Sequence, residues 1–414
     1  MLTLPRAASQ RNAEPVAGVD RRAFVPYLEG LRGAGAMYIV FGHAWLTVVA
    51  LRPDLLSAIP GFYRINASGN SMVGMFLVVS GYVLGLPVAR HGQRFRGGLV
   101  KFAKRRALRL LPGYYAALLL AIPISLCCAT VLGDGLSQRT FALAIVLHVL
   151  MLHDVLTRTV VAIDGPLWSV AVECDIYVLF ALLLVPLARR AGFLRMVVAS
   201  FALGLLPTLI GALRHQGAYY PLAQASPWFL GLFALGYAAA NLSINDSPRI
   251  VAILERWPWQ SLAFAAAFAA IAYVVVVPPG EAAHTLRWLE DSIVGVALAA
   301  QFVADARARR AGRTTPFERF WRFRPFIFVG AFSYSLYLIH QPLLDVFAAF
   351  VRSGWSDAHV IRWMALAAAF AVIVSYPFYL LFERPFVTSY RRKGDAASLR
   401  GARAVVITTA DPAP

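Results

Sequence analysis

The sequence predicts an all-α polytopic membrane bundle of ten transmembrane helices with both termini in the cytoplasm. Three observations support this prediction: the apolar composition, the lengths of the apolar stretches and the distribution of positive charge. Of the 414 residues, 59% are hydrophobic and only 14% are charged. A soluble domain has about 45–50% apolar and about 25% charged residues. The composition therefore argues against a soluble globular protein, a disordered chain and a disulfide scaffold.

The apolar stretches define the expected helices. A helix needs about 20 mostly apolar residues to cross a bilayer. The stretches that meet this need are 33–51, 72–89, 112–133, 167–188, 194–213, 226–242, 259–278, 286–304, 326–351 and 360–383. We expect one transmembrane domain at 24–386, flanked by cytoplasmic tails at 1–23 and 387–414. Residues 1–23 lack the apolar core of a signal peptide.

A further apolar stretch, 140–156, is shorter and contains two histidines. If it does not cross, 30 of the 39 Lys and Arg lie on the side of the termini and eight on the other side. If it does cross, the division becomes 17 against 21. Cytoplasmic loops carry the excess of Lys and Arg. We therefore predict ten spans, with 140–156 re-entrant or interfacial on the outer side.

The formal net charge of +18 also bears on the partners. A nucleic-acid binder distributes basic residues over a polar chain, so we expect no nucleic-acid partner here. Cys127, Cys128 and Cys174 lie in apolar surroundings and show no metal-ligand spacing. We interpret them as small apolar side chains in the packing and predict no bound metal.

The first span carries a cation and an imidazole on one face. Arg32 and His43 are eleven positions apart, which is about 20° past three full turns and roughly 16 Å along the axis. An imidazole with a pKa near 6.5 suits a general base, and a histidine bonded between helices is the equally weighted alternative. Gly30, Gly33 and Gly35 follow no strand, so they indicate a helix interface rather than a dinucleotide site.

Near the start of the fourth span lies an aromatic residue, Trp168, and a carboxylate, Glu173, follows five positions later. Glu173 could orient His43 or hold an acceptor hydroxyl, and the alternative is a carboxylate that packs between helices. Trp168 could stack on a sugar, although anchoring at the membrane interface is the commoner role.

The ninth span holds a second histidine at a depth similar to that of His43. His340 and Tyr337 are three positions apart and Ser333 is four before Tyr337, so the three share a helix face. Interhelical hydrogen bonding is the alternative role for such residues. Titratable groups on three spans at comparable depth nevertheless favour a polar site inside the membrane.

A basic segment precedes the third span. Arg105 and Arg109 are four positions apart with Arg106 beside them, a spacing that can bind phosphates with bidentate contacts. On the cytoplasmic side the available phosphates are nucleotides, coenzyme A and lipid headgroups. The alternative is an orientation signal that also contacts anionic membrane lipids.

Taken together, these motifs resemble the integral-membrane acyltransferase-3 family of O-acyltransferases. The matching residues, in the order of the family, are Arg32 and His43, Phe76–Tyr82, Lys104–Tyr115, Leu167–Glu173, Ser333–His340 and Glu383–Phe386. They span roughly residues 22–390. Any one motif is weak, whereas six in order are highly specific.

The resemblance implies a ten-helix enzyme that transfers acyl groups from cytoplasmic acyl-CoA to acceptors that are mostly carbohydrates. It implies that His43 is catalytic and that Arg105, Arg106 and Arg109 engage the coenzyme. We add Arg32 and Tyr114, the latter from the same motif, to the coenzyme-binding set. Many members have two glutamates after Trp-Ser, whereas Glu173 is followed here by a cysteine.

The sequence thus predicts a membrane O-acyltransferase of the bacterial inner membrane, without an attached hydrolase-like domain. The expected donor is acyl-CoA, most simply acetyl-CoA, and the expected acceptor is a polysaccharide or glycolipid hydroxyl. His43, Glu173 and His340 are the expected catalytic residues, and Trp168, Ser333 and Tyr337 the expected acceptor-binding residues. A proton-coupled transporter or flippase, a membrane scaffold or receptor, and a small glycoside such as a macrolide as acceptor remain alternatives. The sequence leaves the oligomeric state open.

Overall fold

The computed structural model describes residues 21–55, 69–132, 137–213, 226–277 and 286–386, and these form helices without any strand. The helices are α1 (Arg21–Leu51), α4 (Gly69–Arg90), α5 (Gly98–Leu132), α6 (Gln138–Val149), η1 (Gly165–Leu167), α7 (Trp168–Leu179), η2 (Phe180–Leu184), α8 (Val185–Ala191), α9 (Phe193–Leu213), α11 (Phe229–Ile244), α12 (Pro248–Arg256), α13 (Trp259–Val276), α15 (Arg287–Arg310), α16 (Pro316–Trp321), α17 (Arg324–Ala331), α18 (Ser333–Ala349) and α19 (Asp357–Phe382). The predicted tails, 1–23 and 387–414, lie almost wholly outside the described residues.

Seven of the described helices are long and apolar enough to cross a membrane: α1, α4, α5, the continuous unit from η1 to α8, α9, α13 and α19. The pair α17 and α18 adds an eighth candidate span if it crosses as one bent unit. The prediction of an all-α polytopic membrane bundle is therefore confirmed. The other two predicted stretches correspond to α11, an apolar helix of 16 residues, and to α15, which carries charged residues near both ends.

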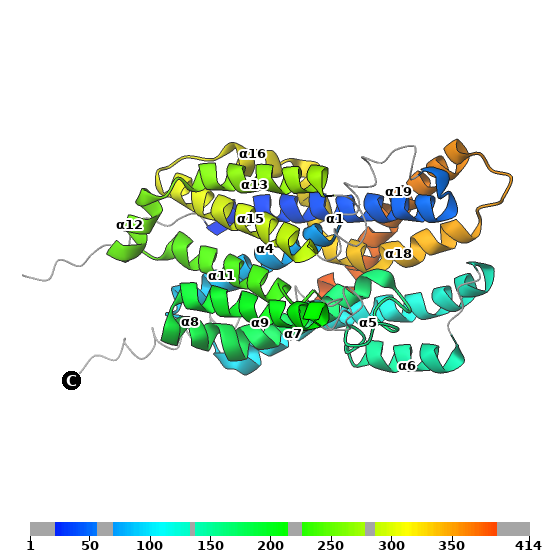
Figure 1. The fold of residues 1–414 in the computed structure, drawn as a ribbon, viewed down its shortest axis with the longest axis horizontal. Helices are drawn as coiled ribbons and strands as arrows, with labels where there is room; N and C mark the ends of the chain where they lie inside the picture. The colour runs from blue at the N-terminus through cyan, green and yellow to red at the C-terminus, as the bar shows by residue number, and fades with distance from the viewer. Residues whose placement is uncertain (1–20, 56–68, 133–136, 214–225, 278–285, 387–414) are drawn as a thin grey trace, which may run out of the picture.

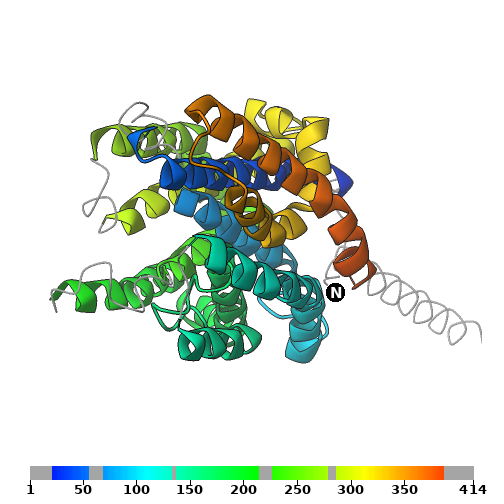
Figure 2. The same ribbon diagram turned by 90° about the vertical axis from the view of Figure 1, so that its right-hand side faces the viewer.

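Most helices run along the long axis of the molecule (Figure 1). α12 lies at one end of this axis, and the turn between α18 and α19 lies at the other. Seen from the α18–α19 end, α19 crosses in front of α1 (Figure 2). α18 packs against α1, α5 and α19, so a residue on α18 can contact three other helices.

Glycines allow α1 to pack closely on its neighbours. A Cβ atom at Gly30 would lie 1.7 Å from the Trp321 carbonyl oxygen, and one at Gly33 would lie 2.0 Å from the Phe326 carbonyl oxygen. At Gly35 a Cβ atom would meet the Met75 side chain of α4 at 2.3 Å. The prediction that these glycines form a helix interface is confirmed.

The ninth predicted span is bent. α17 and α18 meet at 75° with Phe332 at the break, and the Phe332 side chain is buried. Ser333 begins α18, and its Oγ donates a hydrogen bond to the Gly330 carbonyl at 3.0 Å. This bond satisfies one of the carbonyls that the end of α17 leaves free.

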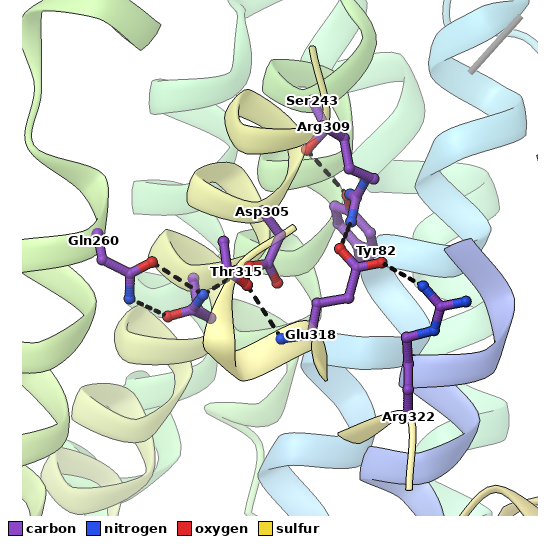
Figure 3. Close-up of polar contacts among 9 residues, drawn as sticks. Tyr82, Ser243, Gln260, Asp305, Arg309, Thr315, Glu318 and Arg322 are labelled. Atoms are coloured by element: carbon purple, nitrogen blue, oxygen red, sulfur yellow. Dashed lines mark hydrogen bonds and ion pairs between the residues drawn. The ribbon is translucent and has the colours of Figure 1, made fainter. Parts of the chain in front are cut away.

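A buried polar network joins α15 to α16 (Figure 3). Asp305 accepts hydrogen bonds from Gln301 and Thr315, and Thr315 accepts one from the backbone N–H of Glu318. Glu318 also forms an ion pair with Arg309 at 3.0 Å. Burial raises the pKa of Asp305 from about 3.8 to about 6. This network holds the connection between α15 and α16 in place, and α16 in turn packs against α1.

The short helix α6 ends beside the middle of α5. Tyr114 and Tyr115 lie near the midpoint of the 35-residue α5, and their hydroxyls donate to the carbonyls of His148 and Val149, each at 2.9 Å. The segment 150–164 that follows contains no regular helix. The predicted stretch 140–156 is thus a 12-residue helix followed by turns, and it reaches half the length of its neighbour.

Candidate active site

The two predicted histidines meet between α1 and α18. The Nδ1 atom of His43 lies 3.0 Å from the Nε2 atom of His340, and the ring centroids are 5.0 Å apart. His340 is fully buried, and His43 is partly exposed. The expectation of a similar depth for these residues therefore agrees with their direct contact across a helix interface.

Backbone carbonyls determine which nitrogens of the neutral pair carry protons. The Nδ1 atom of His340 lies 2.7 Å from the Tyr337 carbonyl oxygen and 3.2 Å from that of Leu336. A carbonyl can only accept, so His340 carries its proton on Nδ1 and has a lone pair on Nε2. His43 must then donate from Nδ1, which leaves the lone pair of His43 on Nε2. This is the tautomer in which His43 can act as a base.

Polar groups on α18 continue from the histidine pair toward the α18–α19 turn. The Gln341 side chain lies beside the His43 imidazole, within reach of a hydrogen bond. Its Nε2 atom donates to Asp345 at 2.7 Å. Tyr337, Gln341 and Asp345 are spaced four apart, so they occupy one face of α18. This face offers hydrogen-bonding partners over about 12 Å of the helix.

Glu173 lies in a separate network. It accepts hydrogen bonds from Ser80 of α4 and from Tyr177 of its own helix, and the Ser80 contact measures 3.3 Å. The Arg106 guanidinium lies 5.9 Å from the centre of the Tyr177 ring and interacts electrostatically with Glu173. Within the described residues, no hydrogen bond joins Glu173 to His43.

The three arginines of the basic motif point to different partners. Arg109 forms an ion pair with Glu383 and lies 5.8 Å from the Tyr334 ring centre. Arg105 is half-buried, and its guanidinium donates to a backbone carbonyl at 3.4 Å. Arg106 has a buried Nε atom with no hydrogen-bond partner among the described residues. Of the three, Arg106 is the one with an unused buried donor.

The closing motif of the sequence explains the position of Arg109. Glu383 is 2% exposed and accepts from Arg109 and from Ser335 Oγ at 2.7 Å. A buried carboxylate is stable when it is paired and hydrogen-bonded. Glu383 therefore holds Arg109 against α18.

Arg32 is half-buried and forms no ion pair with another described residue. It lies on α1, eleven residues before His43 and on the same side of the helix, as its spacing predicts. A cation without a carboxylate partner is available to an anionic ligand.

The other predicted site residues have mainly intramolecular partners. Tyr337 donates to the Pro166 carbonyl at 2.9 Å and contacts Ser169 Oγ at 2.7 Å, which joins α18 to the start of α7. Trp168 stacks on Phe229 of α11 with ring centroids 6.1 Å apart. Ser333 bonds at the α17–α18 break and Tyr114 at the end of α6, as described above.

A second cluster of polar residues lies where α6 ends, and none of its members is among the predicted site residues. His148 and His153 are fully buried and stack with centroids 3.8 Å apart. Asp154 and Asp164 are buried, and both carboxylate oxygens of Asp164 lack a hydrogen-bond partner among the described residues. The two histidines within one short apolar stretch were the only signal that could have suggested this cluster.

Sequence reasoning also missed Ser80, Gln341 and Glu383 as contacts of the site. Ser80 and Glu383 lie within motifs that resemble the family, but their partners are far away in the sequence. Gln341 directly follows His340, where its position on α18 could have suggested a contact with α1.

The bundle thus contains a histidine pair beside a polar helix face and, in a separate network, a buried guanidinium nitrogen without a hydrogen-bond partner among the described residues. The model of the acyltransferase-3 family, described as an acyltransferase domain, matches residues 25–380. The chain belongs to the acyltransferase-3 family. No curated protein and no solved structure matches it.

Family membership establishes that this chain is a membrane acyltransferase, so its substrates include an acyl donor and an acyl acceptor. The matched range begins before His43 in α1 and ends near the end of α19. It therefore includes every residue of the site described above except Glu383.

Proposed function

We propose that this acyltransferase-3 protein transfers an acyl group, most simply acetyl, from cytoplasmic acyl-CoA to a hydroxyl of a carbohydrate. The acceptor would be a cell-surface or exported polysaccharide or a glycolipid. The observation that supports this proposal best is the contact between His43 and His340, which places the lone pair of His43 on Nε2. A fixed neutral imidazole inside a membrane bundle is suited to remove a proton from a hydroxyl.

In the proposed reaction, His43 Nε2 accepts the proton of the acceptor hydroxyl while the hydroxyl oxygen attacks the thioester carbonyl. The carbon–sulfur bond breaks, the new ester forms, and the proton passes from His43 to the departing thiolate of coenzyme A. His340 acts as a positioning residue, because its Nε2 atom accepts the hydrogen bond from His43 Nδ1. That bond becomes charge-assisted when His43 is protonated.

The donor would enter from the end of the bundle that carries the basic segments. Arg32 and Arg106 are the proposed direct contacts of the coenzyme phosphates. Within the described residues, Arg32 forms no ion pair, and the buried Nε atom of Arg106 has no hydrogen-bond partner. Arg105 would add charge at the entrance. Arg109 and Tyr114 would act indirectly, by holding α18 and α6 in place.

The acceptor would approach along the polar face of α18 from the opposite end. Gln341 and Tyr337 are the proposed contacts nearest His43, and Trp168 would supply an aromatic surface for a sugar ring. Glu173 would set the position of Arg106 through Tyr177 rather than act on the acceptor. Ser333 would contribute through the shape of the α17–α18 break.

The same proposal includes ten spans with both termini in the cytoplasm of a bacterial inner membrane. The proposal rests on the distribution of 30 Lys and Arg against eight, together with α11 and α15 as the two additional spans. The depth of α6 supports a re-entrant segment rather than a further crossing.

The decisive experiment is acyl transfer by purified protein with the variant His43→Ala. Wild-type protein should release coenzyme A from labelled acetyl-CoA only when glycosides or a membrane glycan extract are present. The variant should accumulate in the membrane but lose at least about 100-fold in rate, as expected for a general base. His91→Ala, at an exposed histidine in the turn after α4, is the matched control and should retain full activity. Full activity of the His43 variant would refute the proposal.

A further inference from the structure

A cavity of about 500 Å³ lies where α18 ends and α19 begins. Figure 1 shows that this turn is at the end of the molecule away from α12. Its lining residues are Val346, Phe347, Phe350, Arg352, Trp355, His359 and Trp363. A smaller adjoining cavity of about 220 Å³ shares His359 and Trp363 and adds Arg362 and Leu366. Neither cavity includes a residue of the proposed acyl-transfer site.

The aromatic walls of the larger cavity are held in fixed orientations. Trp355 stacks on His359 with centroids 4.5 Å apart, and Phe347 lies 5.0 Å from Trp363. The Trp363 indole N–H donates to the Phe347 carbonyl at 2.8 Å. Phe350 is 64% exposed, so the cavity is open toward the surroundings. The site therefore offers a preformed apolar surface.

Two arginines border these aromatic walls without an acidic partner. Within the described residues, Arg352 and Arg362 form no ion pair, and the neighbouring carboxylate of Asp357 is paired with Arg52. In the orientation proposed above, Arg52, Arg352 and Arg362 are three of only eight cations on the outer side. The positive-inside rule places the excess of Lys and Arg on the cytoplasmic side. It therefore does not explain why three arginines gather at this outer end of the bundle.

An apolar stripe on α19 leads away from the arginines. His359, Trp363, Leu366, Phe370 and Ile373 follow the spacing of one helix face. Leu366, Phe370 and Ile373 are 55%, 41% and 69% exposed. The stripe is roughly 21 Å long, which exceeds half of a hydrocarbon core about 30 Å thick. Its length and direction suit one lipid chain whose headgroup lies at the arginines.

From this arrangement we infer that the α18–α19 cavity is a binding site for an anionic phospholipid of the outer leaflet. Arg352 and Arg362 bind the headgroup phosphate, the aromatic walls enclose the glycerol region, and the stripe on α19 receives a chain. Arginine is suited to phosphate because its planar guanidinium can form two parallel hydrogen bonds. The inference uses the proposed orientation but not the acyl-transfer chemistry.

The test measures binding of spin-labelled phosphatidylglycerol by quenching of tryptophan fluorescence in the full-length protein, in phosphatidylcholine nanodiscs. Wild-type protein should prefer phosphatidylglycerol to phosphatidylcholine and approach saturation at one lipid per chain. The double variant Arg352→Gln/Arg362→Gln should weaken the phosphatidylglycerol affinity about tenfold. Phe350→Ala, at an exposed position where folding should persist, should weaken binding of both lipids.

The double variant Arg139→Gln/Arg158→Gln is the matched control, because both arginines are exposed and belong to the same side in the proposed orientation. An equal loss in this control would show diffuse attraction to the membrane and overturn the site. Unchanged binding in the cavity variants would also overturn it. Displacement of the lipid by millimolar inorganic phosphate would refute the assignment to a lipid. Since His43→Ala should bind like wild type, failure of the proposed acyl transfer would leave this result interpretable.

Discussion

At the scale of single residues, the proposed division of labour between His43 and His340 leads to a kinetic prediction. His340→Ala should lower kcat by about 100-fold and leave the KM for acyl-CoA unchanged, because His340 fixes the tautomer of His43 without contacting the donor. His340→Gln should recover part of the rate, since an amide oxygen can accept the hydrogen bond from His43 Nδ1. Steady-state kinetics of both variants test this, and equal rates for Ala and Gln would contradict the positioning role.

The arginines of the basic motif lead to a second residue-scale prediction. Arg106→Gln should raise the KM for acyl-CoA about tenfold, because the buried Nε atom of Arg106 has no hydrogen-bond partner in the described part of the chain and is available to a phosphate. It should lower thermal stability less than Arg109→Gln does, because Arg106 contacts Tyr177 but forms no ion pair with a described residue. Arg109→Gln should instead lower stability by roughly 3–5 kcal/mol, since it leaves the buried Glu383 carboxylate without its cation. KM values and melting temperatures of the two variants separate these effects, and an unchanged KM for Arg106→Gln would exclude a phosphate contact there.

These residues also show what the sequence could predict. The depth of each histidine follows from its position along a span, so the approach of His43 and His340 was foreseeable. Helical spacing places Arg105, Arg106 and Arg109 on neighbouring faces, but it does not say what the end of a long side chain meets. The partners of Arg106 and Arg109 come from α7 and from the end of α19, so only the packing of these helices determines them.

At the scale of elements, the connection from α15 to α16 should respond to pH through Asp305. Burial raises its folded pKa to about 6 from about 3.8, so its favourable contribution is present below pH 4 and is lost as the pH rises through 6. Asp305→Asn should therefore raise the melting temperature by a few degrees at pH 8 and leave it unchanged near pH 4. Asp246→Asn, at an exposed ion pair with Arg310, is the control and should have no effect at either pH. The same shift at both pH values would contradict the assignment.

The attachment of α6 to α5 gives a second prediction at this scale. Tyr114→Phe removes the hydroxyl that bonds to the His148 carbonyl and leaves a buried acceptor unsatisfied, at a cost of roughly 1–3 kcal/mol. Hydrogen exchange at the end of α6 should become faster in this variant. Tyr115→Phe removes an equivalent bond that is exposed, so its effect should be smaller. Equal exchange in wild type and Tyr114→Phe would show that α6 is held by packing alone.

Helix α6 also marks where pattern reasoning reaches its limit. The stretch 140–156 is mostly apolar, and the distribution of Lys and Arg predicts that it does not cross the membrane. The division into a helix and a following turn segment depends on tertiary contacts with Tyr114 and Tyr115, which a local pattern does not contain. By contrast, the close α1–α17 contact was foreseeable, because glycines at helical spacing have few other uses inside a membrane.

At the scale of the whole molecule, the distribution of charge predicts the topology. The basic connections after α4, α8, α11 and α15 must share one side if Lys and Arg set the orientation. A periplasmic reporter fused after residue 160 should be active, and one fused after residue 400 should be inactive, with the reverse result for a cytoplasmic reporter. Fusions after residues 95 and 353 serve as internal controls for the two sides. Activity of the periplasmic reporter at residue 400 would show an odd number of crossings. It would also place the arginine-rich connections on both sides of the membrane, and the donor entrance and the lipid site would then need to be reassigned.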